Sequence, residues 1–170
     1  HKADPDHPIH AKACHHLSNN QRRNCIGKGT DAAAKAMSLS KEEGLTYIPP
    51  FNDLDVATGQ GTIAFEIFQS LPNVDVILVP IGGGGLISGI AMAIKMLNPS
   101  CKVIGVQAAG APSMFRSIKD GQIGTLASVS TIADGIAVKK PGSLTYEICS
   151  QYVDDIVSVT DDEISAAILA

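Results

Sequence analysis

The sequence lacks the features that mark several protein classes. No apolar run approaches the ~20 residues that a membrane-crossing helix needs, and the amino terminus has no apolar core typical of a signal peptide. Basic residues are few and scattered, and the formal net charge is -4, which argues against nucleic acid as a partner. The four cysteines, Cys14, Cys25, Cys101 and Cys149, are widely spaced, which favours reduced thiols over disulfides. We therefore expect a cytoplasmic protein that does not act at a membrane.

The chain has enough apolar residues for one domain with a core, since 45% of its 170 residues are hydrophobic. Residues 74–97 organise it: a near-continuous apolar run of strand length is followed by four glycines, Gly82 to Gly85, and then by a helical pattern. Such a run is typical of a parallel strand covered on both faces. The glycines either form only a tight turn or, before a helix amino terminus, hold a phosphate or another anion.

The glycines do not match two common nucleotide-binding motifs. In the dinucleotide fingerprint G-x-G-x-x-G, two residues separate the last two glycines, but in the nearest match here, Gly83, Gly85 and Gly89, three residues separate them. The next strand also ends on Gln107 rather than on an acid. A Walker loop needs a lysine directly after its last glycine, and the first lysine after Gly85 is Lys95, well down the predicted helix. These departures weigh against nicotinamide binding and exclude an ordinary nucleotide triphosphatase.

Helical and strand patterns alternate from Thr30 onward. Thr30 is a plausible N-cap for a helix whose C-cap is Gly44. The segment LTYI, residues 45–48, is expected to be a short strand, and two prolines then impose a loop on PPFND, residues 49–53. The next helix is expected to begin at Thr62. Three of its side chains should face inward at helical spacing: Ile63, Ile67 and Phe68.

The remaining pattern completes an α/β chain. The elements expected there are, in order, a strand at 102–107, a short helix at 111–121, a long loop or a set of short pieces at 122–142, a helix at 144–152 and a strand at 155–159. Thr160 and Glu163 form a capping box for a last helix, whose buried face should begin with Ile164, Ala167 and Ile168. This order predicts an α/β fold in three layers around a mostly parallel, twisted sheet.

Six blocks in this order and spacing resemble the threonine dehydratase and serine racemase group of fold-type II pyridoxal 5'-phosphate (PLP) enzymes. The blocks are YIPPFND (47–53), GQGT (59–62), VPIGGGGLISGIA (79–91), KVIGVQ (102–107), ADGIAV (133–138) and VDDIVSVTDDEI (153–164). The resemblance covers roughly residues 30–170 and does not include residues 1–29. It implies the end of a small domain at 30–50 and part of the PLP-binding large domain at 51–170.

The resemblance also implies a cofactor, a site and an activity. The residues it assigns to PLP binding are Gly82, Gly83, Gly84, Gly85, Leu86, Phe51 and Gly135. Phe51, placed beside the cofactor ring, would serve equally well as an apolar anchor of the core. The implied function is a PLP-dependent L-threonine or L-serine ammonia-lyase that acts on a small amino acid and forms a homo-oligomer. The alternatives are a serine racemase-like enzyme and a non-catalytic binding or oligomerisation module.

The resemblance does not extend to the family's reactive lysine. None of the ten lysines lies in a Ser-x-Lys-x-Arg-Gly motif, so the sequence assigns no catalytic residue. Lys139 and Lys140, beside the ADG loop, are candidates for a substitute, but their adjacency favours a solvated pair. We expect the chain to be a fragment or truncated form that carries a cofactor half-site.

Two residue sets bear on metal binding. One set, in residues 1–29, is His10, Cys14, His15 and His16, whose spacing is not that of a zinc finger. A poorly ordered or tag-like lead, or a displaced segment, is the favoured interpretation of residues 1–29. The other is the divalent-metal position of the family, which falls here on Gln107, Ala111 and Ser113. Hard cations need charged oxygen ligands, and these side chains are neutral. We therefore expect no metal site.

Overall fold

A computed structural model describes residues 29–170 as two units, residues 29–48 and Pro49–Ala170. The first unit contains helix α3 (Gly29–Glu43), which ends at Gly44 with φ 66°, so the predicted C-cap glycine is confirmed. The helix already includes Thr30, which is therefore not its N-cap. The predicted strand at residues 45–48 is wrong. The amide of Leu45 donates to the carbonyl of Ser40 at the end of α3, and no strand of the described residues pairs with residues 45–48.

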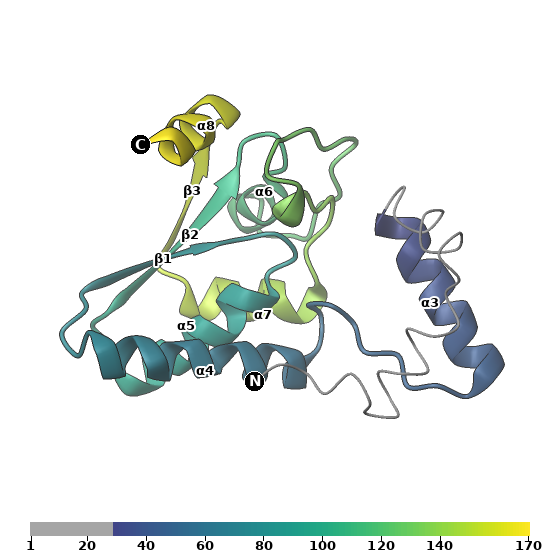
Figure 1. The fold of residues 1–170 in the computed structure, drawn as a ribbon, viewed down its shortest axis with the longest axis horizontal. Helices are drawn as coiled ribbons and strands as arrows, with labels where there is room; N and C mark the ends of the chain where they lie inside the picture. Colours follow the sequence, from purple (N-terminus) through teal and green to yellow (C-terminus); the bar gives the residue numbers. More distant parts are fainter. Residues whose placement is uncertain (1–28) are drawn as a thin grey trace. The chain divides into compact units, whose positions relative to one another are not determined.

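The second unit is a parallel sheet with helices (Figure 1). Its elements are α4 (Leu54–Ser70), β1 (Val76–Pro80), α5 (Gly85–Leu97), β2 (Lys102–Ala108), α6 (Ser113–Lys119), the 3-10 turn η1 (Asp134–Ile136), α7 (Ser143–Tyr152), β3 (Asp155–Val159) and α8 (Asp161–Leu169). The strand order is β1-β2-β3, and both pairs are parallel, with Val76 opposite Lys102 and Ile104 opposite Asp155. The α/β class and its parallel sheet are thus confirmed.

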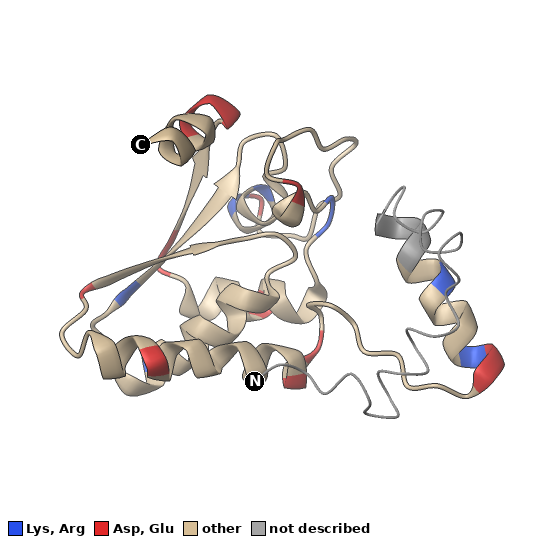
Figure 2. Cartoon of the chain, in the orientation of Figure 1, with Lys and Arg blue, Asp and Glu red and all other residues tan. Residues whose placement is uncertain are grey.

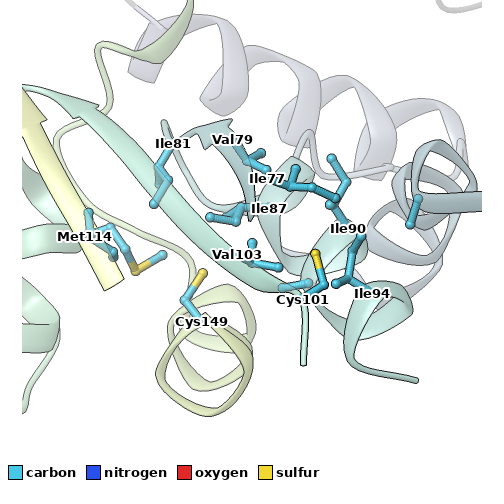
Figure 3. Packing of buried hydrophobic residues seen from close by; sticks show 13 residues of the cluster. Ile77, Val79, Ile81, Ile87, Ile90, Ile94, Cys101, Val103, Met114 and Cys149 are labelled. Atoms are coloured by element: carbon cyan, nitrogen blue, oxygen red, sulfur yellow. The ribbon is translucent and has the colours of Figure 1, made fainter. Parts of the chain in front are cut away.

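One hydrophobic cluster joins the sheet to helix α5 (Figure 3). Its large members include Ile77 and Val79 of β1, Val103 of β2, and Ile87, Ile90 and Ile94 of α5. Each such side chain contributes roughly 1.5–3 kcal/mol when it is fully buried. Ile81, just before the glycine loop, and Ile87, just after it, belong to the same cluster, so the core fixes the position of both ends of that loop.

Helix α4 begins eight positions before the predicted start, because Asp53 caps it by accepting the amide of Val56 at 3.0 Å. The glycines at 59 and 61 therefore lie inside the helix. Gly61 permits a close approach to α5, since a Cβ there would lie 3.0 Å from the carbonyl oxygen of Gly89. The sequence pattern of these glycines favoured a loop, but tight helix packing explains them as well.

The buried face of α4 differs from the predicted one. It consists of small residues: Ala57, Gly61 and Ala64. Ile67 and Phe68 pack partly buried against the core, whereas Ile63 is 36% exposed. Small residues occupy this face because the two helices lie too close together for larger side chains.

Two further expectations about burial are wrong. Strand β1 alternates instead of being covered on both faces, and Leu78 on its other face is 67% exposed. The capping box of Thr160 and Glu163 is present at the start of α8, but this helix has no buried residue, and Ile168 is 74% exposed. In both places no element between residues 29 and 170 covers the apolar side chains. No helix in the same range is long and apolar enough to cross a membrane.

Candidate functional site

The glycine loop joins β1 to α5 and leaves a row of backbone donors free. Gly84 is the N-cap of α5, with φ 98° and no side chain to accept a hydrogen bond. Among the residues that the structure describes, none accepts a hydrogen bond from the amides of Gly82, Gly83, Gly84, Gly85 and Leu86. Gly83 to Gly85 are buried, and buried amides without acceptors are costly. With the positive end of the helix dipole beside them, these amides fit an anion such as a phosphate.

Phe51 forms one wall of this loop. Its ring lies against Gly83, where an added Cβ would collide with three ring carbons. A Cβ at Gly85 would lie 2.8 Å from the Cβ and 2.9 Å from the Cα of Phe51. Phe51 is itself half-buried and packs directly on the loop.

The segment that carries Gly135 forms a second wall. A Cβ at Gly82 would lie 3.1 Å from the Cα of Ile136, 3.2 Å from a methyl group of Val138 and 3.6 Å from the carbonyl oxygen of Gly135. The structure therefore brings together the three predicted parts of the site: the glycine loop, Phe51 and the ADG loop. Leu86, also predicted, is half-buried and packs against the hydrophobic core.

Helix α7 supports the loop from behind, a contact that the sequence did not reveal. The hydroxyl of Thr145 donates to the carbonyl oxygen of Gly83 at 2.6 Å, and the amide of Gly142 donates to the same oxygen at 3.3 Å. A Cβ at Gly84 would lie 2.7 Å from the terminal methyl of Met114 and 2.8 Å from the Cβ of Thr145. Gly84 is therefore required both by its backbone angle and by the space around it.

Asn52 ties the Phe51 loop to the start of α7. Its Oδ1 accepts the amide of Leu144 at 2.9 Å, and its Nδ2 donates to the hydroxyl of Ser143 at 3.4 Å. The N-cap of α7 is Gly142, which has no side chain, so Asn52 supplies the cap from a distant part of the chain. No signal in the sequence pointed to this partner, because Ser143, directly before the predicted helix at 144–152, is itself a suitable capping residue.

Asp161 holds the loop that precedes η1. It lies in the acidic first turn of α8 (Figure 2), and its carboxylate accepts the hydroxyl of Thr131 at 2.5 Å and the amide of Ile132 at 3.1 Å. The hydroxyl of Thr131 in turn accepts the amide of Ala133 at 3.1 Å. These bonds fix the segment that leads into Gly135.

Among residues 29–170, no side chain with an activated nucleophile adjoins the loop. Burial raises the pKa of the Cys149 thiol to about 11, although the contact with Ser88 at 3.8 Å opposes this shift. Cys149 is therefore a neutral, buried thiol, and like Cys101 it is free, as expected for these two cysteines. Lys139 and Lys140 are exposed, and the amine of Lys139 donates to the carbonyl of Ala127 at 3.4 Å.

The neutral residues at the family's metal position do not fit a divalent cation. Gln107 is fully buried; its Nε2 donates to the carbonyl of Ile81 at 3.3 Å and its Oε1 accepts the amide of Phe115 at 2.9 Å. Ser113 is buried, and its hydroxyl has no partner within the described part of the chain; Ala111 has no polar side-chain atom. Gln107 therefore works as a backbone bridge, and the absence of a tight magnesium or calcium site stays a prediction. The histidines and the cysteine at 10–16, which are candidates for metal binding but are disfavoured by their spacing, lie outside the described residues.

Comparisons with known proteins agree with the resemblance. The model of the pyridoxal-phosphate dependent enzyme family matches residues 15–170, starting before residue 30. L-threonine ammonia-lyase of Thermotoga maritima is 50% identical over 139 residues, which are 82% of this chain and 35% of that protein. Threonine deaminase isoform 2 of Solanum lycopersicum, in its processed form, has a TM-score of 0.76 at 45% identity, over 78% of this chain and 36% of that one. Maize serine racemase has a TM-score of 0.75 at 39% identity, over 78% of this chain and 42% of that one. The chain thus spans less than half the length of these relatives.

Proposed function

The chain belongs to the pyridoxal-phosphate dependent enzyme family, and on that premise we propose that its glycine loop binds the phosphate group of PLP. The observation that carries this proposal is the set of amides from Gly82 to Leu86, which have no acceptor within the described residues. Backbone amides at a helix amino terminus recognise phosphate without a basic side chain. Phe51 and the segment around Gly135 border the same loop and would confine the cofactor beside it.

Bound PLP supplies an aldehyde that reacts with amino groups and a pyridine ring that withdraws electrons from the α-carbon of an amino acid. The role of this chain is to hold and orient that group. Its glycine loop would fix the phosphate, and Phe51 would exclude water from one side of the loop. Neither residue set moves a proton, so we assign no catalytic residue within the chain.

For the whole protein we propose an L-threonine or L-serine ammonia-lyase, which would release 2-oxobutyrate or pyruvate together with ammonia. The support is the 50% identity to the L-threonine ammonia-lyase of Thermotoga maritima. A serine racemase-like activity is the second candidate, favoured by the fold shared with maize serine racemase at 39% identity.

Cofactor binding is tested by titrating the protein with PLP and, separately, with inorganic phosphate. Gly82→Ala should weaken both affinities by about tenfold or more, because the new methyl would press on Ile136 and Val138 and displace a wall of the site. Gly59→Ala is the matched control, since its Cβ meets nothing within 4 Å and it lies inside helix α4. Equal affinities for wild type and Gly82→Ala would refute the assignment of the loop.

Turnover is tested on the same protein with PLP and L-threonine or L-serine. We expect no keto acid or ammonia above the PLP-only control, because general acid or base work alone is worth roughly 100- to 10,000-fold and no lysine here occupies the family motif. Clear turnover would contradict this expectation. Borohydride reduction followed by peptide mapping would then show whether Lys139 or Lys140 carries the cofactor.

We also propose a homo-oligomer located in the cytoplasm. The exposed apolar face of β1, with Val76 at 48% and Leu78 at 67%, supports association with another surface. Sedimentation analysis of the purified protein should show a species larger than the monomer. A monomer at all concentrations would contradict the proposal.

A further inference from the structure

Thr145 forms one hydrogen bond to the glycine loop, and the acceptor is a backbone carbonyl group. Its hydroxyl donates at 2.6 Å to the oxygen of Gly83, with the oxygen of Gly142 as a second, longer partner at 3.2 Å. The side chain is fully buried, so water does not compete for the hydroxyl. The amide of Gly142 adds a weaker bond to the Gly83 oxygen at 3.3 Å.

Because a peptide group is rigid, the hydrogen bond from Thr145 to the Gly83 oxygen also sets the direction of the Gly84 amide, which is a hydrogen-bond donor. In a planar trans peptide the carbonyl of one residue and the amide of the next point in opposite directions. Holding the oxygen of Gly83 toward α7 therefore directs the amide of Gly84 away from α7. The chain contains no cis peptide bond between residues 29 and 170, so this relation holds at the loop.

Glycine makes such control necessary. Gly84 has φ 98°, and its neighbours in the loop are glycines too. Glycine peptides reach both positive and negative φ readily, so this peptide has little intrinsic preference for one orientation. A hydrogen bond to the Gly83 oxygen selects one orientation, and it also polarises the peptide so that the Gly84 amide becomes a stronger donor.

We propose that Thr145 is a positioning residue for phosphate binding, which orients the Gly83–Gly84 peptide so that the Gly84 amide faces the anion. The inference rests on the proposed function of the glycine loop and adds to it a residue on another helix. Thr145 does not touch the phosphate. It acts only through the peptide that it holds.

Two substitutions separate the hydroxyl of Thr145 from its bulk. Thr145→Val keeps the volume and removes the hydrogen bond, whereas Thr145→Ser keeps the hydroxyl and removes a methyl group. The bulk also matters, because the Cβ of Thr145 packs close to Gly84. Ser88→Ala is the matched control: Ser88 is fully buried on α5, and its hydroxyl contacts Cys149 of α7 at 3.8 Å without touching Gly83.

The experiment combines phosphate titration with NMR of protein labelled with ¹⁵N-glycine. Thr145→Val should weaken inorganic phosphate binding roughly tenfold, the typical effect of one hydrogen bond, and should shift the ¹⁵N resonance of Gly84. Thr145→Ser should restore both to near the wild-type values. Ser88→Ala should leave both the affinity and the Gly84 resonance unchanged. If the core were merely loosened by losing a buried hydroxyl, Ser88→Ala would weaken binding as well.

The outcomes distinguish this inference from the proposed function. If wild type does not bind phosphate, the proposed function fails and the positioning role fails with it. If wild type binds phosphate, equal binding by Thr145→Val with an unmoved Gly84 resonance would overturn the inference alone. Failure of Thr145→Ser to restore affinity would also overturn it, because bulk rather than the hydroxyl would then matter. Should Thr145→Val not fold, wild type decides: the Thr145 hydroxyl proton should exchange slowly and show a nuclear Overhauser contact to the α-protons of Gly84, close to which its oxygen lies. Absence of that contact would overturn the inference.

Discussion

The ring of Phe51 fills the space that a side chain at Gly83 would need. This relationship makes the two positions energetically dependent on each other. Gly83→Ala should lower the free energy of unfolding by about 1–3 kcal/mol, because the half-buried ring must move to admit the methyl group. In a Phe51→Ala background the same change should cost less, with a coupling energy of about 1–2 kcal/mol. Urea unfolding of the four proteins in the cycle measures this coupling, and strictly additive costs would refute the contact.

A comparison of Gly84 with Gly121 tests whether the crowding around Gly84 or only its positive φ makes glycine necessary there. Both have positive φ, 98° and 68°, but a Cβ at Gly84 would meet Met114 and Thr145 within 3 Å, whereas a Cβ at Gly121 meets nothing within 4 Å. Gly121→Ala should therefore cost only the backbone penalty of about 1–2 kcal/mol. Gly84→Ala should cost about 2–5 kcal/mol, because a steric term adds to that penalty. Chemical denaturation measures both, and equal costs would show that the crowding at Gly84 is unimportant.

Asp161 and Asp162 provide a matched pair for the loop before η1. Asp161→Ala removes the acceptor of Thr131 and Ile132, whereas Asp162 is exposed and accepts no bond from residues 29–170. Asp161→Ala should raise hydrogen exchange at the Ile132 and Ala133 amides by about tenfold, as expected for the loss of one or two partly exposed bonds. It should also weaken PLP binding. Asp162→Ala removes the same charge and should change neither quantity, so parallel effects of the two variants would point to charge alone.

Local patterns predicted the elements whose signals lie within a short stretch. The apolar run before the glycines predicted β1, and the capping box at Thr160 and Glu163 correctly predicted the start of α8. The same reasoning failed at residues 45–48, because a strand depends on a neighbour that no local pattern reveals. It failed at the start of α4 for a related reason. The glycine at 61 permits close packing on Gly89, and a pattern cannot distinguish that use from a loop.

The residues of the candidate site likewise divide into those that a sequence pattern predicted and those that it missed. Family blocks placed the glycine loop, Phe51 and Gly135, and the structure brings these parts together. Their assignment to PLP stays a prediction. Asn52 and Thr145 were missed because their partners lie 92 and 62 positions away in the sequence. Polar side chains that bond to a distant backbone carry no periodicity and no motif, so only the folded arrangement identifies them.

Asp154 gives the fold a measurable dependence on pH. Its carboxylate accepts the amine of Lys95 at 2.8 Å and the amide of Val103 at 2.7 Å. Burial alone would raise the pKa of Asp154, but these bonds outweigh it and hold the pKa below its ordinary value. Because the folded pKa lies below the unfolded one, which is about 3.9, the stabilisation is complete above that value and is lost as the pH falls through the folded pKa.

Asp154→Asn should therefore lower the free energy of unfolding by about 1 kcal/mol at pH 7, a modest figure because the pair is partly exposed. The difference from wild type should shrink below about pH 4, where protonation removes the same charge from the wild-type carboxylate. Asp155→Asn is the neighbouring control: its Oδ1 accepts only the amide of Ile156 within the described chain, so the variant should follow the wild-type pH curve. Urea unfolding between pH 2.5 and pH 7 measures all three proteins. A constant gap between wild type and Asp154→Asn across this range would contradict the assigned role of the carboxylate.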